Sequence, residues 1–199
     1  MKKILLIAVM AIACAAFVNA QPRAIGGRLG EFNGVSYQHS LGESNMLEVE
    51  AGFNLGNYWG NRMVGWEKGQ QWNLYGHNIQ AAVTYDWIDP FGATFPAMQK
   101  GEWHWYLGVG AAGGFGWHGY SYVKGFGTVD GDVNFGFAAA AGRVGVEYDF
   151  WFPLQLSLDF RPTLGAGLAE TRDINGKKGV DTGLYYDLFG ICLGVRYKF

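Results

Sequence analysis

The chain has few charges, few cysteines and few prolines for its length. Asp, Glu, Lys and Arg make up 16% of the 199 residues, against about 25% in an average soluble protein. The formal net charge of -2 lacks the basic excess that a nucleic-acid-binding protein needs. Only five prolines accompany the 32 glycines, and no Gly-X-Y period is present, so collagen and proline-rich linkers are excluded. A hydrophobic content of 49% also excludes a disordered chain.

The first 20 residues have the three parts of a secretory signal peptide. Lys2 and Lys3 precede an apolar stretch over residues 4–18, and Val18-Asn19-Ala20 provides a small-residue cleavage site. We expect residues 1–20 to be cleaved and residues 21–199 to form one domain. Lipid attachment at Cys14 is an alternative, but the leucine usually found three residues before a lipidated cysteine is missing. After cleavage at Ala20 only Cys192 remains, which excludes an intrachain disulfide.

Beyond residue 20 the chain has no run of 18 strongly apolar residues, which argues against a transmembrane helix. Apolar and polar or small residues instead alternate with a period of two, as in a β-strand with one apolar face. This alternation is found in five segments: residues 47–55, 78–87, 103–117, 143–150 and 154–161. The sequence therefore predicts an all-β fold.

The positions of the turns predict eight strands. Asn33-Gly34 is the dipeptide preferred in a type I′ hairpin. Further short connections are expected at residues 42–45, 89–100 and 151–153, and long polar or glycine-rich loops at residues 60–71, 118–133 and 168–181. We therefore predict an eight-stranded antiparallel transmembrane β-barrel with up-and-down topology and both termini periplasmic, in which the long loops lie outside the cell. Pro162 lies within the seventh strand, so we expect a bulge or an end of regular pairing there.

The last nine residues carry the most specific signal. Leu193, Val195, Tyr197 and Phe199 alternate with small and basic residues, and the chain ends on the aromatic residue. This pattern resembles the C-terminal strand of bacterial outer-membrane proteins, and residues 21–199 resemble the small eight-stranded barrels of the OmpA and OmpX type. The resemblance implies a multi-pass protein of the Gram-negative bacterial outer membrane that is assembled by the barrel-assembly machinery. It also implies contact with outer-membrane lipids and lipopolysaccharide, and we expect a monomer.

Charged residues of both signs fall on the inward faces of the predicted strands. An eight-stranded barrel is only wide enough to be filled by its own side chains or to hold one small ligand. We interpret the charges as an ion-pair network that closes the lumen, and a gated ion or proton path is the alternative. The network is predicted to contain Arg28, Glu48, Glu50, Arg143, Glu147, Asp159, Arg161 and Arg196.

The inward positions of the outer half are unusually small. They suggest an alternative function, the binding or transport of a slender hydrophobic molecule in a pocket there. The expected lining is Gly108, Gly110, Ala112, Gly114, Phe137 and Ala139. Larger inward side chains such as Leu74, Tyr106 and Phe135 provide the opposite interpretation, a filled interior.

Some eight-stranded barrels modify lipid A as acyltransferases or deacylases, using a histidine, a serine and an acidic residue. The candidates here are His118, Ser121 and either Asp130 or Asp132, but their spacing does not predict a catalytic geometry. We therefore expect no catalytic residues, and no metal-ligand or cofactor motif is found. The favoured function is a non-enzymatic barrel with structural or interaction roles, whose loops contact a host or surface ligand.

Overall fold

The computed structural model describes residues 21–54, 61–67, 70–90, 100–123, 127–172 and 178–199. These residues form β-strands joined by turns and bends. No helix within the described ranges is long and apolar enough to cross a membrane. The strands are β1 (Gln21–Gly30), β2 (Asn33–Ser40), β3 (Asn45–Asn54), β4 (Asn61–Glu67), β5 (Gln70–Pro90), β6 (Glu102–Val123), β7 (Gly127–Asp149), β8 (Leu154–Phe160), β9 (Thr163–Arg172), β10 (Lys178–Asp187) and β11 (Ile191–Lys198).

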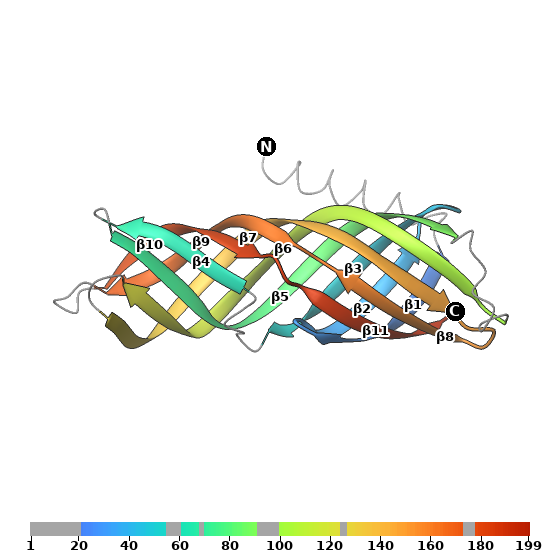
Figure 1. Ribbon diagram of the computed structural model, residues 1–199, viewed down its shortest axis with the longest axis horizontal. Helices are drawn as coiled ribbons and strands as arrows, with labels where there is room; N and C mark the ends of the chain where they lie inside the picture. Colours follow the sequence, from blue (N-terminus) through green and yellow to red (C-terminus); the bar gives the residue numbers. More distant parts are fainter. Residues whose placement is uncertain (1–20, 55–60, 68–69, 91–99, 124–126, 173–177) are drawn as a thin grey trace, which may run out of the picture.

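The strands close into an eight-stranded antiparallel barrel (Figure 1). Five barrel strands are continuous, namely β1, β2, β5, β6 and β7. The other three each comprise two described strands: β3 with β4, β8 with β9, and β10 with β11. The predicted all-β, eight-stranded antiparallel barrel is confirmed, and the start of β1 and the end of β11 lie side by side at one end of it.

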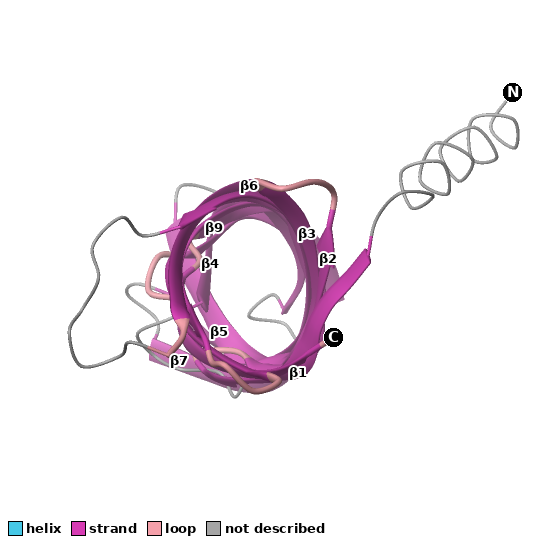
Figure 2. Cartoon of the chain, turned by 90° about the vertical axis from the view of Figure 1, so that its right-hand side faces the viewer, coloured by secondary structure: helices cyan, strands magenta, loops and turns pink. Residues whose placement is uncertain are grey.

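The number of strands around the barrel changes along its length. Near the termini the ring contains β1, β2, β3, β5, β6, β7, β8 and β11, and we call this part the terminal section. Further away, β4 pairs directly with β10, and the ring contains β4, β5, β6, β7, β9 and β10, which we call the distal section. Figure 2 looks into the barrel from its terminal end. The barrel narrows from eight to six strands because the β1–β2 hairpin is short.

The hairpin turn differs from the predicted one. β1 ends at Gly30, whose φ of 140° is in the region that favours glycine. Glu31 and Phe32 form the turn, and the Asn33 side-chain amide donates to the Gly30 carbonyl at 3.1 Å. The predicted Asn33-Gly34 type I′ turn is therefore wrong, since both residues begin β2. Phe32 is buried, and the Arg161 guanidinium lies 5.0 Å from its ring centroid.

Much of the three predicted long loops is strand. The barrel wall is extended by strand residues 61–67, 118–123, 127–133, 168–172 and 178–181. The long strands β5, β6 and β7 contain 21, 22 and 23 residues. A tilted strand of that length rises by roughly 55 Å, whereas the apolar band of an outer-membrane barrel is about 25 Å tall. The sequence prediction missed these strands because it relied on apolar alternation.

The seventh barrel strand is interrupted at Pro162, as predicted. β8 ends at Phe160 and β9 begins at Thr163. The Pro162 carbonyl still accepts a hydrogen bond of 2.9 Å from the amide of Gly142 on β7. The wall therefore remains linked across the interruption.

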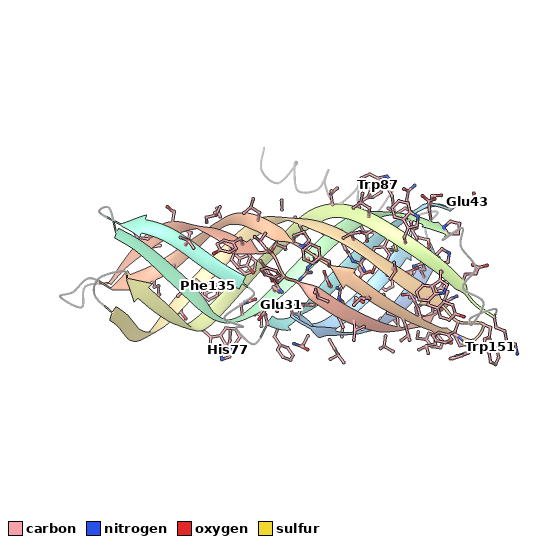
Figure 3. All side chains as sticks on the ribbon, in the orientation of Figure 1. Glu31, Glu43, His77, Trp87, Phe135 and Trp151 are labelled. Atoms are coloured by element: carbon pink, nitrogen blue, oxygen red, sulfur yellow. The ribbon has the colours of Figure 1, made fainter. Side chains whose placement is uncertain are left out.

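Burial is inverted relative to a soluble protein. Large apolar side chains of the terminal section, such as Val109, Leu193 and Val195, are exposed on the outside. Charged side chains such as Glu48 and Arg143 are buried inside. Figure 3 shows the outward positions of Trp87 and Trp151 near the terminal end. This inside-out distribution is typical of a barrel surrounded by lipid.

Candidate functional site

Arg143 on β7 lies at the centre of the charged interior. Its guanidinium contacts the carboxylates of Glu48 at 2.6 Å, Asp86 at 2.8 Å and Asp159 at 3.4 Å. These three acidic residues come from β3, β5 and β8, so Arg143 connects four strands around the lumen. All four side chains are fully or almost fully buried, which makes mutual pairing necessary for their charges.

Three further arginines extend the same network. Arg28 contacts Glu48 at 3.0 Å and Glu50 at 2.9 Å and is also paired with Asp159. Arg196 contacts Glu48 at 2.8 Å, and Arg161 is paired with Glu50. The connected network contains Arg28, Arg143, Arg161 and Arg196 with Glu48, Glu50, Asp86 and Asp159. The four guanidinium groups balance the four carboxylates.

Neutral groups add hydrogen bonds to this network. Arg196 donates to Ser36 and Ser157 at 2.7 Å each and to Gln155 at 3.2 Å. The Tyr106 hydroxyl donates to Asp159 and accepts from Arg143, both at 3.1 Å. The Arg143 guanidinium also lies 4.3 Å from the Tyr106 ring centroid. These contacts hold the charged side chains in fixed positions across the interior.

The structure brings together seven of the eight residues predicted for the network. The eighth, Glu147, lies nearer the terminal end and is paired with Arg23, and it is linked to the network through the Gln38 amide, which donates to Glu48 at 2.9 Å and to Glu147 at 3.5 Å. Asp86 was not predicted as a member, although it shares the inward face of its strand with Thr84, which donates to it at 3.1 Å. The position of Asp86 on the inward face of its strand could have identified it. Its partner Arg143 on β7 could not be found without knowing which residues of the two strands lie at the same height.

Aromatic and apolar side chains occupy the interior further toward the distal end. The rings of Phe137 and Tyr185 stack with centroids 3.7 Å apart and an interplanar angle of 8°. They belong to a buried cluster that comprises Met63, Leu74, Phe135, Phe137, Ala139, Ala169 and Tyr185. Figure 3 shows Phe135 within this part of the barrel.

The residues predicted to line a hydrophobic pocket face neighbouring groups. An added Cβ at Gly114 would lie 2.8 Å from Cε1 of Phe137, and one at Gly108 would meet the Asp86 carboxylate. Gly110 faces the backbone carbonyl of Val83, and Ala112 packs with Ala82 and Ala141. Phe137 and Ala139 belong to the cluster described above. A separate apolar hollow of about 350 Å³ lies around Gly145, and exposed side chains such as Trp105, Val144 and Leu158 line it.

Several predicted sites lie outside the part of the chain whose side chains the structure describes. The side chains of His118, Ser121, Asp130 and Asp132 lie outside the described positions. The expected signal peptide, residues 1–20, lies outside the described ranges as well. These predictions therefore remain predictions.

The predicted assembly signal forms the strand that closes the barrel. β11 pairs with β1 on one side and β8 on the other. The side chains of Leu193, Val195, Tyr197 and Phe199 are exposed on the outer surface. Tyr197 and Phe199 contact each other edge to face, with ring centroids 5.6 Å apart.

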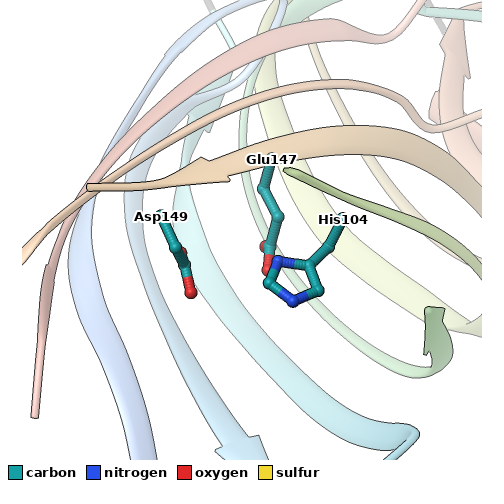
Figure 4. Close-up of side chains that lie close together, drawn as sticks. All are labelled: His104, Glu147 and Asp149. Atoms are coloured by element: carbon teal, nitrogen blue, oxygen red, sulfur yellow. The ribbon is translucent and has the colours of Figure 1, made fainter. Parts of the chain in front are cut away.

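A second polar group lies at the terminal end and was not predicted as a site. Glu147 and Asp149 on β7 lie beside His104 on β6 (Figure 4). Arg23 is paired with Glu147 and lies 3.7 Å from Asp149, while Lys198 contacts Asp149 at 3.0 Å. Its members come from four strands, so no local spacing in the sequence could indicate it.

Comparison with known proteins identifies the fold. No family model matches the sequence, and no curated protein matches it. The structure is similar to the crystal structure of a major outer membrane protein from Thermus thermophilus, with a TM-score of 0.51 and 12% sequence identity. The match covers 91% of this chain and 100% of the other. The chain thus has the fold of a bacterial outer-membrane β-barrel.

Proposed function

We propose that this protein is a small, non-enzymatic outer-membrane barrel whose lumen is closed to diffusion. The observation that carries this proposal is the Arg143 network, which connects strands around the terminal section through fully paired charges. The Phe137–Tyr185 stack blocks the interior a second time in the distal section. A lumen filled by fixed side chains supports a structural or surface-interaction role rather than an open pore.

The orientation follows from the fold and the expected export signal. Bacterial outer-membrane barrels have short periplasmic turns and long extracellular connections, so the terminal section would face the periplasm and the distal section the exterior. The expected signal peptide and the C-terminal strand ending at Phe199 support export followed by insertion through the barrel-assembly machinery. Extended beyond the membrane, the six-stranded distal section would present its connecting loops to lipopolysaccharide or to a surface ligand.

The first prediction concerns conductance. The purified barrel, reconstituted into planar bilayers, is expected to show no stepwise ionic current of the size given by an open porin reconstituted in the same way, since paired side chains fill its lumen. Single-channel recording in a potassium chloride solution is the measurement. Regular porin-sized steps in most insertions would contradict a closed lumen, whereas small proton-selective currents would favour the gated path.

The second prediction tests the enzymatic alternative. Replacing His118 with alanine is expected to leave the lipid A of the host membrane unchanged, because no catalytic role is assigned to this residue. Mass spectrometry of extracted lipid A from cells with the original protein, the His118→Ala variant and no protein is the measurement. A modified lipid A species that needs both the protein and His118 would contradict the non-enzymatic proposal.

The contacts at the small-residue positions do not favour the hydrophobe-binding alternative. Phe137 covers Gly114, and the Asp86 carboxylate covers Gly108, so the proposed pocket would require these groups to move. The apolar hollow around Gly145 lies among outward side chains, where lipid acyl chains would fill it.

A further inference from the structure

His104, Glu147 and Asp149 converge inside the terminal end of the barrel. His104 lies directly across from Glu147 in the β6–β7 register, and Asp149 follows two residues later on the same face of β7. One ligand atom from each of the three side chains lies within 4.8 Å of the others. Figure 4 shows the imidazole of His104 beside the Glu147 carboxylate. Because all three residues are on two hydrogen-bonded strands, their relative positions are fixed by the barrel wall.

Two polar side-chain atoms in this group are buried without a hydrogen-bond partner among the described residues. They are Nδ1 of His104 and Oδ1 of Asp149. Asp149 is only 8% exposed, so water does not reach its carboxylate freely. An unpaired buried polar atom costs about 1–3 kcal/mol. A bound cation would satisfy both atoms, with the imidazole of His104 in the tautomer that leaves Nδ1 unprotonated.

The positive charges beside these carboxylates come from two partly exposed side chains. Arg23 contacts Glu147 and Asp149, and Lys198 contacts Asp149. The Arg23 and Lys198 side chains are 16% and 29% exposed, and they lie close to the chain ends of β1 and β11. A bound cation would replace the charge of these groups, and the competition between them would weaken its binding.

We propose that His104, Glu147 and Asp149 form a binding site for a divalent cation of the zinc class, which exchanges with the Arg23 side chain. An imidazole nitrogen and carboxylate oxygens are ordinary zinc ligands, and three protein ligands leave one position for water. The sequence contains no zinc motif because the ligands come from two strands separated by more than 40 residues. This site is independent of whether the lumen is closed.

The test uses the folded barrel in detergent, without a histidine tag, and zinc chloride as the probe. Isothermal titration calorimetry is expected to show one zinc per chain. His104→Gln should weaken binding by at least about 10–100-fold, the loss that follows removal of a group that only supports a metal ligand. His77→Gln is the matched control, since His77 is exposed on the outer wall, and it should bind as the original protein does. Arg23→Gln should bind zinc about tenfold more tightly, because it removes the competing charge.

Folding of each variant is checked by its heat-dependent shift in gel electrophoresis. If His104→Gln does not fold, Asp149→Asn replaces it with the same expectation. The proposal is overturned if the original protein shows no saturable zinc binding, or if the folded ligand variant binds as tightly as the His77→Gln control. Exchange with Arg23 is overturned if Arg23→Gln binds no more tightly than the original protein.

Discussion

Replacing Arg143 with alanine is expected to lower the free energy of unfolding by about 3–5 kcal/mol, the usual cost of removing one partner from a buried ion pair. The change leaves Asp86 without its arginine partner and removes one of the arginines paired with Glu48 and Asp159. It also removes a guanidinium that donates to Tyr106. Urea unfolding in lipid vesicles, followed by tryptophan fluorescence, measures the effect.

Lys198→Ala is the control for the Arg143 prediction. Lys198 also pairs with a carboxylate, Asp149, but it is partly exposed and has a single acidic partner, so its loss should cost about 1 kcal/mol or less. Arg143→Lys should fall between the two, because lysine keeps the charge but not the planar donor geometry of arginine. Equal stability of the Arg143→Ala and Lys198→Ala proteins would contradict a central role for Arg143.

The barrel could be predicted from the sequence because its strands alternate clearly between apolar and polar or small residues. Every spanning strand must present apolar side chains to lipid, so segments such as residues 103–117 and 154–161 carry a clear period of two. The inward parity of these strands also identified seven members of the charged network. Alternation along a strand tells which face of the sheet a residue occupies, but not its position along the barrel axis. That limit explains why Glu147 was grouped with the network although it lies near the terminal end with Arg23.

The narrowing of the barrel could not be predicted, because it depends on pairing between distant segments. The β1–β2 hairpin ends at Glu31 and Phe32, and beyond it β4 pairs with β10. No property of residues 61–67 or 178–187 alone specifies that partner. The metal-site candidate was missed for the same reason, since His104 is brought to Glu147 only by the β6–β7 register.

The narrow section also explains one small inward residue of β6, Gly114. Fewer strands leave less space inside, and Phe137 and Tyr185 already occupy part of it. Glycine at position 114 allows the Phe137 ring to approach the wall, since an added Cβ there would lie 2.8 Å from that ring. Small inward residues are therefore equally consistent with a tightly packed, narrow barrel and with a pocket.

A charge placed on the outer wall should have an effect that depends on its distance along the barrel. Val109 is 57% exposed and lies about midway between Trp105 and Phe115 on the outward face of β6. An arginine at this position would lie near the middle of the apolar band. Val109→Arg is therefore expected to lower the free energy of unfolding in lipid vesicles by about 2–4 kcal/mol, as measured for arginine near the bilayer midplane in other barrels.

Val180→Arg is the matched control for Val109→Arg. Val180 is also an exposed valine, but it lies on β10 in the distal section, which we place beyond the membrane. Its replacement should cost about 1 kcal/mol or less, because an arginine there remains in water or at the interface. If both variants are destabilised equally, the distal section lies within the bilayer. The proposal that a six-stranded extension carries the loops away from the membrane would then be wrong, whereas a difference of about 2 kcal/mol or more would support it.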